Sequence, residues 1–95
     1  MAIVLTALAR VKDWRALRHL NRETLLECAR DVGATRYRLY RNAKDASEVL
    51  VLAELPDHEA LRELARVVGA RLGALPESET PDDREWEATD LDGIG

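Results

Sequence analysis

Two side chains in this sequence could take part in acid–base chemistry on a small molecule: His19 and Tyr37. His19 lies in a segment with helical periodicity, among Arg15, Arg18 and Arg22. Nearby cations disfavour the imidazolium form, so His19 would stay neutral and could act as a base near pH 7. Tyr37 could donate a hydrogen bond to a substrate anion. The alternative for His19 is a solvated helix flank, which is the commoner situation for a histidine.

Four further side chains are candidates for binding a ligand: Trp14, Arg18, Tyr40 and Trp86. The three aromatic rings among them could stack on an aromatic molecule. Packing is nevertheless the commoner role for Trp14, which begins a helix on its apolar side. Trp86 could close the mouth of a pocket or cover the end of a sheet. Arg18, beside His19, would add positive charge.

Tyr40 shares one side of a predicted strand with Arg36 and Arg38, and Arg41 follows directly. These arginines could bind an anionic substrate. Charges on a strand also protect an exposed sheet edge from pairing with other chains, and this is the commoner role. Both interpretations stay open at this point.

Metal and cofactor chemistry has no pattern to support it here. No His, Cys and carboxylate spacing resembles a metal site, and glycine-rich phosphate loops and serine nucleophile motifs are missing from the sequence. The only cysteine, Cys28, falls within a helical apolar stripe, where the thiol acts as a small apolar group. We therefore expect no metal and no cofactor.

Two helices must position these side chains. Asp13 is a candidate N-cap for a helix from about Trp14 to about Asp31, and Asp57 for a second from about His58 to Leu72. Gly33 and Gly73 can end them in the left-handed conformation. The stripe that the first helix should bury, widened by Leu25 and Ala29, is Trp14, Leu17, Leu20, Thr24, Cys28 and Val32.

The remaining chain is predicted to form strands and the loops between them. Ile3–Val11 and Val49–Ala53 are apolar at nearly every position, which is typical of strands covered on both faces. The second belongs to a predicted hairpin, Ala34–Leu55, with a polar loop at Asn42–Ser47. Arg84–Asp90 alternates and predicts a short last strand.

The order β-α-β-β-α-β predicts one α+β domain over residues 1–95 with the ferredoxin-like topology. This is a four-stranded antiparallel sheet with two helices on one face, the first and third strands in the centre and the second and fourth at the edges. Tyr37 and Leu39 should face the helices. The other face keeps half of the apolar side chains of both central strands, and an apolar patch of that size normally marks an interface. We therefore expect a homodimer that joins two such faces into a β-barrel.

Charge and composition limit the partners. The net charge is −4, but residues 1–76 carry +3 and residues 77–95 carry −7. No basic stripe with interleaved aromatics is present, so we expect no nucleic acid partner. The apolar run at residues 2–9 is too short to cross a bilayer and lacks a signal-peptide pattern. With a single cysteine, we expect a cytoplasmic protein without a membrane partner. An acidic loop with two prolines, residues 74–83, could cover a pocket or reach the other protomer.

Three stretches together resemble the dimeric α/β-barrel superfamily: VKDWRAL, GATRYRLYRN and EVLVLAELPDHEAL. The likeness covers about residues 2–90 and is greatest to small proteins of the antibiotic biosynthesis monooxygenase type. It implies a pocket between helices and sheet. Because members of the superfamily include oxygenases of aromatic polyketides, a small aromatic molecule is a candidate ligand. Haem-degrading members use an asparagine in the first strand and a histidine in the second helix. Here the first strand has no asparagine, and His58 lies at the entrance of the second helix, so a haem role is not expected.

Three functions follow as hypotheses. The first is a cofactor-independent monooxygenase of aromatic or polyketide-like molecules, and the second is a polyketide cyclase or isomerase that uses base chemistry. The third is a non-catalytic dimer that binds a ligand or a partner. The third is favoured if the space between helices and sheet is filled with side chains.

Overall fold

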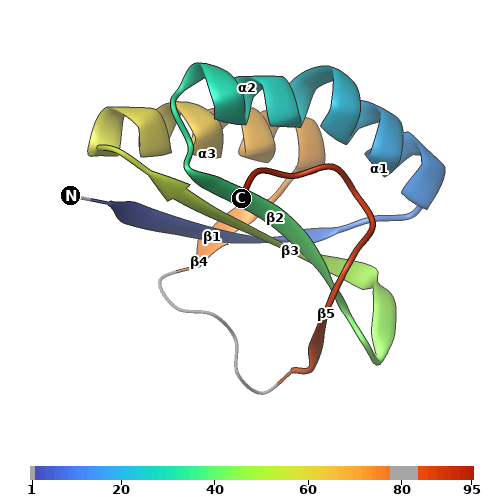
Figure 1. The fold of residues 1–95 in the computed structure, drawn as a ribbon. Helices are drawn as coiled ribbons and strands as arrows, with labels where there is room; N and C mark the ends of the chain where they lie inside the picture. The colour runs from blue at the N-terminus through green and yellow to red at the C-terminus, as the bar shows by residue number, and fades with distance from the viewer. Residues whose placement is uncertain (1, 78–83) are drawn as a thin grey trace.

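Helices form one layer of the molecule and an antiparallel sheet forms the other, with both helices on the same face of the sheet (Figure 1). The structure is a computed structural model that describes residues 2–77 and 84–95. This arrangement confirms the α+β class and is compatible with the predicted ferredoxin-like topology.

In the described residues the sheet has the order β4-β1-β3-β2-β5, and every neighbouring pair is antiparallel. The strands are β1 (Ile3–Arg10), β2 (Arg36–Asn42), β3 (Asp45–Leu55), β4 (Leu75–Glu77) and β5 (Trp86–Ala88). The prediction that the first and third strands lie in the centre is confirmed.

The prediction for the sheet edges is wrong in two respects. The strand beside β1 is β4, which lies in the segment predicted as an acidic loop. The predicted last strand shortens to β5 and pairs with the end of β2, so β2 is not a free edge there. The remainder of that loop, residues 78–83, lies outside the described residues. Likewise, the hairpin loop shrinks to Ala43 and Lys44, because Asn42 already pairs with Asp45.

The first helix runs from Trp14 to Asp31, as predicted, in three parts. These are α1 (Trp14–Leu20), a π-helical turn η1 (Asn21–Leu25) and α2 (Leu26–Asp31). The second helix, α3 (His58–Leu72), has the predicted bounds.

Asp13, Asp57 and Gly73 cap the helices as predicted. The Asp13 carboxylate accepts hydrogen bonds from the backbone N–H groups of Arg15 and Ala16, and the Asp57 carboxylate accepts one from Ala60 at 2.8 Å. Gly73 ends α3 with φ of +68°, where a side chain would be strained.

The stripe that the first helix buries contains the predicted Leu17, Leu25 and Ala29, but it is shifted away from the other predicted positions. Its most buried positions are spaced by four residues: Leu17, Asn21, Leu25 and Ala29. The predicted positions Leu20, Thr24, Cys28 and Val32 are only half-buried and lie beside it. The shift is associated with η1, in which the N–H of Leu26 donates to the carbonyl oxygen of Asn21, five residues back.

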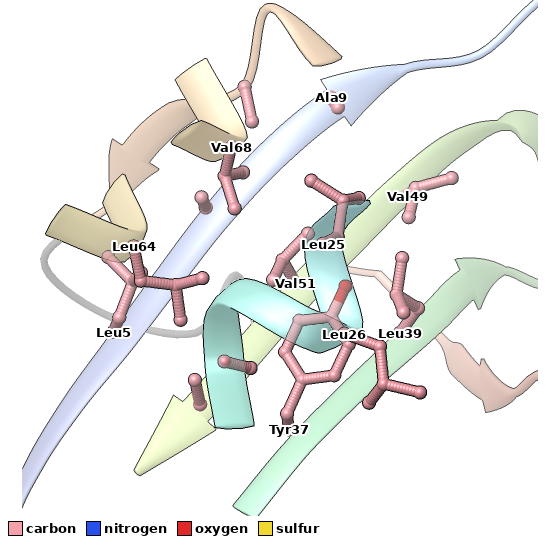
Figure 2. Close-up of a cluster of buried hydrophobic side chains, with 14 of the residues drawn as sticks. Leu5, Ala9, Leu25, Leu26, Tyr37, Leu39, Val49, Val51, Leu64 and Val68 are labelled. Carbon is pink, nitrogen blue, oxygen red and sulfur yellow. The ribbon is translucent and has the colours of Figure 1, made fainter. Parts of the chain in front are cut away.

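The core lies between the helices and the sheet. Register places Leu5, Ala53 and Tyr37 on one row across β1, β3 and β2, and Ala7, Val51 and Leu39 on the next. Figure 2 shows Leu25 and Leu26 of the first helix and Leu64 and Val68 of α3 directed at these strands. Tyr37 and Leu39 therefore face the helices, as predicted.

The other sheet face carries the alternate residues of the same strands and has no helix over it (Figure 1). We call it the helix-free face. In the part of the chain that the structure describes, no helix combines the length and the apolar character that crossing a membrane requires.

Candidate functional site

Tyr37, a predicted catalytic donor, lies in the middle of the core. Its side chain is fully buried, and its hydroxyl donates a 2.6 Å hydrogen bond to Oδ1 of Asn21. Burial raises the pKa of the Tyr37 phenol, because the phenolate would lose its hydration. In this position Tyr37 joins the sheet to the first helix, and its hydroxyl is already engaged.

The space between helices and sheet, which the resemblance would make a pocket, is filled by packed side chains. Leu25 and Val51 have no solvent exposure, and neither does Leu64 from the other helix (Figure 2). A hollow of about 890 Å³ lies instead beside the first turns of α3, lined by charged residues such as Asp57 and Arg66. Its lining belongs to α3 and the helix ends beside it.

His19, the predicted base, is exposed on α1. Tyr37 faces the core from the sheet, so the two predicted catalytic side chains do not converge on a common space. The placement of His19 matches the solvated helix flank, which was the alternative interpretation.

The predicted ligand-binding residues fall into two groups on opposite faces of the sheet. Trp14 lies on the helix side, where its Nε1 donates to the carbonyl oxygen of Ala46 at 2.8 Å and the Arg41 guanidinium lies 5.5 Å from its ring. Arg18, on the same helix, pairs with Asp90 at 2.8 Å.

Tyr40 and Trp86 form the second group, on the helix-free face. Tyr40 pairs with Ala88 across β2 and β5, and Asn42 pairs with Trp86 two positions further along. Side chains two apart on a strand share a face, so the phenol and the indole lie on one side of neighbouring strands. Both side chains are half-buried.

The three arginines of the hairpin each have a partner in the chain. Arg36 lies 3.9 Å from Glu54, and Arg41 pairs with Glu87 at 2.6 Å. The guanidinium of Arg38 donates to the carbonyl oxygen of Gly95. Each guanidinium is therefore engaged within the chain, and the three do not converge on one anion-binding point.

The centre of the helix-free face is apolar. Leu8 pairs with Leu50 across β1 and β3, Leu52 pairs with Thr6, and both Leu50 and Thr6 are buried. Val4 and Leu75 extend this patch and are 56% and 71% exposed. Large apolar side chains with such exposure, continuous with an apolar sheet face, are typical of a surface that another molecule covers.

A polar cluster lies at one end of the same face, around the nearly buried carboxylate of Glu48. Its Oε1 lies 2.7 Å from Nε of Arg84 and accepts a longer bond, 3.4 Å, from Asn42. Its Oε2 lies 3.8 Å from Arg10. The register brings Trp86 next to this cluster through Asn42.

Glu48 and Asn21 are the polar residues that sequence reasoning missed. Glu48 lies two positions before Leu50 and four before Leu52, so alternation alone places it on the same face. Asn21 lies four positions from both Leu17 and Leu25, which places it on the buried side of a helix. Within the described residues, no three His, Cys, Asp or Glu side chains are grouped so that they could hold a metal ion.

No family model, no curated protein and no solved structure matches this chain. The resemblance to the dimeric α/β-barrel superfamily therefore stays a prediction. The helix-free face, with Tyr40 and Trp86 beside the Glu48 cluster, is the candidate functional site.

Proposed function

We propose that this protein acts as a homodimer that joins two helix-free faces into a β-barrel and binds a small aromatic molecule inside it, without catalysing a reaction. The observation that carries this proposal is the apolar centre of the helix-free face, with Val4 and Leu75 exposed beside Leu8 and Leu52. Covering such a patch with a second copy removes apolar surface from water on both protomers.

A binding role is favoured over the oxygenase and cyclase roles by the placement of the two candidate catalytic residues. Both reactions need a base and hydrogen-bond donors around one dry pocket. Tyr37 is instead buried with its hydroxyl bonded to Asn21, and His19 is exposed on α1. The filled helix–sheet space supports the same choice.

The ligand site in this proposal is the end of the helix-free face where Tyr40 and Trp86 lie. Their rings offer two aromatic surfaces on neighbouring strands. The Asn42 and Glu48 side chains next to them can hydrogen-bond to polar groups of the ligand. In a face-to-face dimer this end would lie within the barrel, sheltered from solvent.

Light scattering at micromolar concentration tests the dimer. We expect a mass twice that of the 10.7 kDa chain. Val4→Asp and Leu75→Asp should each raise the dissociation constant at least about tenfold, because they place an unpaired charge in the interface. Ala70→Asp on α3 introduces the same charge at an exposed helix position and should leave the mass unchanged. A monomer of the unmodified chain would refute the proposal.

Anthrone- and quinol-type molecules, the substrates that the resemblance implies for an oxygenase, test the binding role. We expect them to quench tryptophan fluorescence without oxygen uptake. Trp86→Ala and Tyr40→Ala should weaken this binding, whereas His19→Ala, on the opposite layer, should not. Oxygen uptake or conversion of the molecule would show that the oxygenase or cyclase hypothesis is correct instead.

A further inference from the structure

Residues 89–95 run from β5 back to the edge of β2, meeting β2 near both ends and arching toward the first helix between these points (Figure 1). We call them the closing segment. The backbone N–H of Tyr37 donates to the carbonyl oxygen of Ile94 at 3.0 Å, and the N–H of Ile94 returns a 2.9 Å bond to Tyr37. Further along, the Thr89 hydroxyl donates to the carbonyl oxygen of Leu39 at 2.8 Å. The closing segment thus covers the edge of β2, but it bends between its two attachment points, because the stretch from Thr89 to Ile94 faces only the stretch from Leu39 to Tyr37.

The first helix supplies the other wall of this groove. Asn21 uses both ends of its amide: Oδ1 accepts from Tyr37, and Nδ2 donates to the backbone carbonyl oxygen of Asp92 at 2.9 Å. The Tyr37 hydroxyl fixes the orientation of the amide, so the Nδ2 donor is aimed at the closing segment. Asn21 is the first residue of the π-helical turn, and such turns occur frequently at functional sites.

The side chains of the closing segment match this groove in shape and charge. Leu91 is buried in the core, while Asp90 and Asp92 pair with Arg18 and Arg22 at 2.8 and 3.6 Å. A Cβ atom at Gly93 would lie 2.4 Å from the backbone oxygen of Tyr37, a distance that real Cβ atoms do not reach. The sequence Asp-Leu-Asp-Gly-Ile therefore has a buried leucine as an anchor and an acid on each side of it. Its glycine is the residue that the close approach to the backbone of Tyr37 requires.

We propose that the edge of β2, Asn21 and the two arginines form a peptide-binding groove that the closing segment occupies in cis. In trans, the groove accepts an acidic peptide of a partner protein that bends in the same way, with a leucine between two acids and a glycine after them. The closing segment acts as the built-in competitor for that partner. This groove lies at the sheet edge on the helix side, so it does not depend on the proposed dimer.

The closing segment is held by contacts that can be exchanged. Of its side chains only Leu91 is fully buried, and the ion pairs of Asp90 and Asp92 are solvent-exposed on both partners. Exposed ion pairs contribute little, and a segment with one buried side chain and few backbone hydrogen bonds to the sheet opens locally at lower cost than the core. A competing peptide needs to replace one anchor and a few backbone hydrogen bonds.

A fluorescein-labelled peptide with the sequence of residues 89–95, added to the full chain, tests the proposal. Leu91→Asp should bind this peptide at least about tenfold more tightly than the unmodified chain, because it releases a competitor present at about millimolar effective concentration. Gly93→Ala keeps Leu91 and should likewise tighten binding of the labelled peptide. It is the variant on which the test rests if Leu91→Asp fails to fold. Equal binding by the unmodified chain and a folded released variant would overturn the proposal.

Charge reversal on the groove gives a matched control. In the Gly93→Ala chain, Arg22→Glu should weaken peptide binding at least about threefold, because Arg22 faces Asp92. Arg15→Glu places the same charge at an exposed position of α1 and should weaken binding less. A labelled peptide that itself carries Gly93→Ala should bind more weakly than the unmodified peptide to every chain. Equal affinities of the two peptides would show that the groove does not recognise this sequence.

Discussion

Replacing Tyr37 by phenylalanine should destabilise the protein, even though the substitution removes only one oxygen atom. The hydroxyl donates to Oδ1 of Asn21 at 2.6 Å, and both side chains are almost fully buried. The substitution removes this hydrogen bond and leaves the Asn21 oxygen without its donor in a place that water reaches poorly. We expect the free energy of unfolding to fall by about 1–3 kcal/mol, the usual cost of leaving a buried polar group unsatisfied.

Urea denaturation followed by circular dichroism measures this difference, and Tyr40→Phe is the matched control. Tyr40 loses the same atom on the half-buried, helix-free side of β2, so its cost should stay within about 0.5 kcal/mol. Asn21→Ala and the double variant complete a cycle, and the coupling between the two side chains should exceed about 0.5 kcal/mol. Equal costs for Tyr37→Phe and Tyr40→Phe would refute the reasoning that the buried bond joins helix and sheet.

The same residue predicts a response to alkaline pH. Burial raises the pKa of the Tyr37 phenol above the ordinary tyrosine value of about 10, so the folded state keeps the phenol proton at pH values where the unfolded chain releases it. The free energy of unfolding should therefore be unaffected by this group below about pH 10 and should fall above it, by at most about 1.4 kcal/mol per pH unit. Tyr37→Phe removes this part of the alkaline loss, which denaturation at several pH values detects.

Two matched pairs of substitutions test other parts of the fold. Gly73→Ala should destabilise the protein by about 1 kcal/mol, since Gly73 has a φ of +68°. Gly69→Ala inside α3 should be neutral or should stabilise the protein by up to about 1 kcal/mol. Thermal denaturation measures both changes in stability, and a change of the same sign for the two variants would contradict the argument. Arg84→Ala should lower the free energy of unfolding by about 1–3 kcal/mol, because it removes the 2.7 Å partner of the nearly buried Glu48 carboxylate. Arg66→Ala breaks only an exposed pair and should cost less than about 1 kcal/mol, so a larger loss at Arg66 than at Arg84 would disprove this ranking.

Local chemistry explains why much of the fold could be predicted from the sequence. Asp13 and Asp57 satisfy free N–H groups at helix starts, and Gly33 and Gly73 adopt positive φ after the helices, so each signal needs only a few neighbouring residues. The face of Tyr37 followed from strand alternation alone. These features do not depend on the rest of the chain.

The features that sequence reasoning missed are decided by distant parts of the chain. Leu75–Glu77 contains a proline and an acid and has weak strand preference, yet β1 offers it an open edge. The π-helical turn at Asn21 shifts the buried stripe, and its polar residue is satisfied by Tyr37 and by the backbone of Asp92, both far away in sequence. A pattern within one helix contains no information about either partner.

The candidate site was predicted only in part for the same reason. Tyr40 and Trp86 share a face because β5 pairs with β2, whereas strand alternation placed Tyr40 only beside Arg36 and Arg38. Trp14 and Arg18 were grouped with them by residue type and lie on the other side of the sheet. Residue types suggested aromatic binding, but only strand pairing decides which rings share a surface.

The two edges of the sheet bear on how a second copy would bind. β4 is only three residues long, and Pro76 within it has no N–H to offer another strand. On the opposite side, β5 and the closing segment pair with β2, from the Asn42–Trp86 pair to the Tyr37–Ile94 bridge. With the closing segment in place, both edges are therefore poor templates for adding a strand from another chain. The helix-free face, by contrast, leaves Val4 and Leu75 exposed beside an apolar centre, so the proposed dimer would associate through this face.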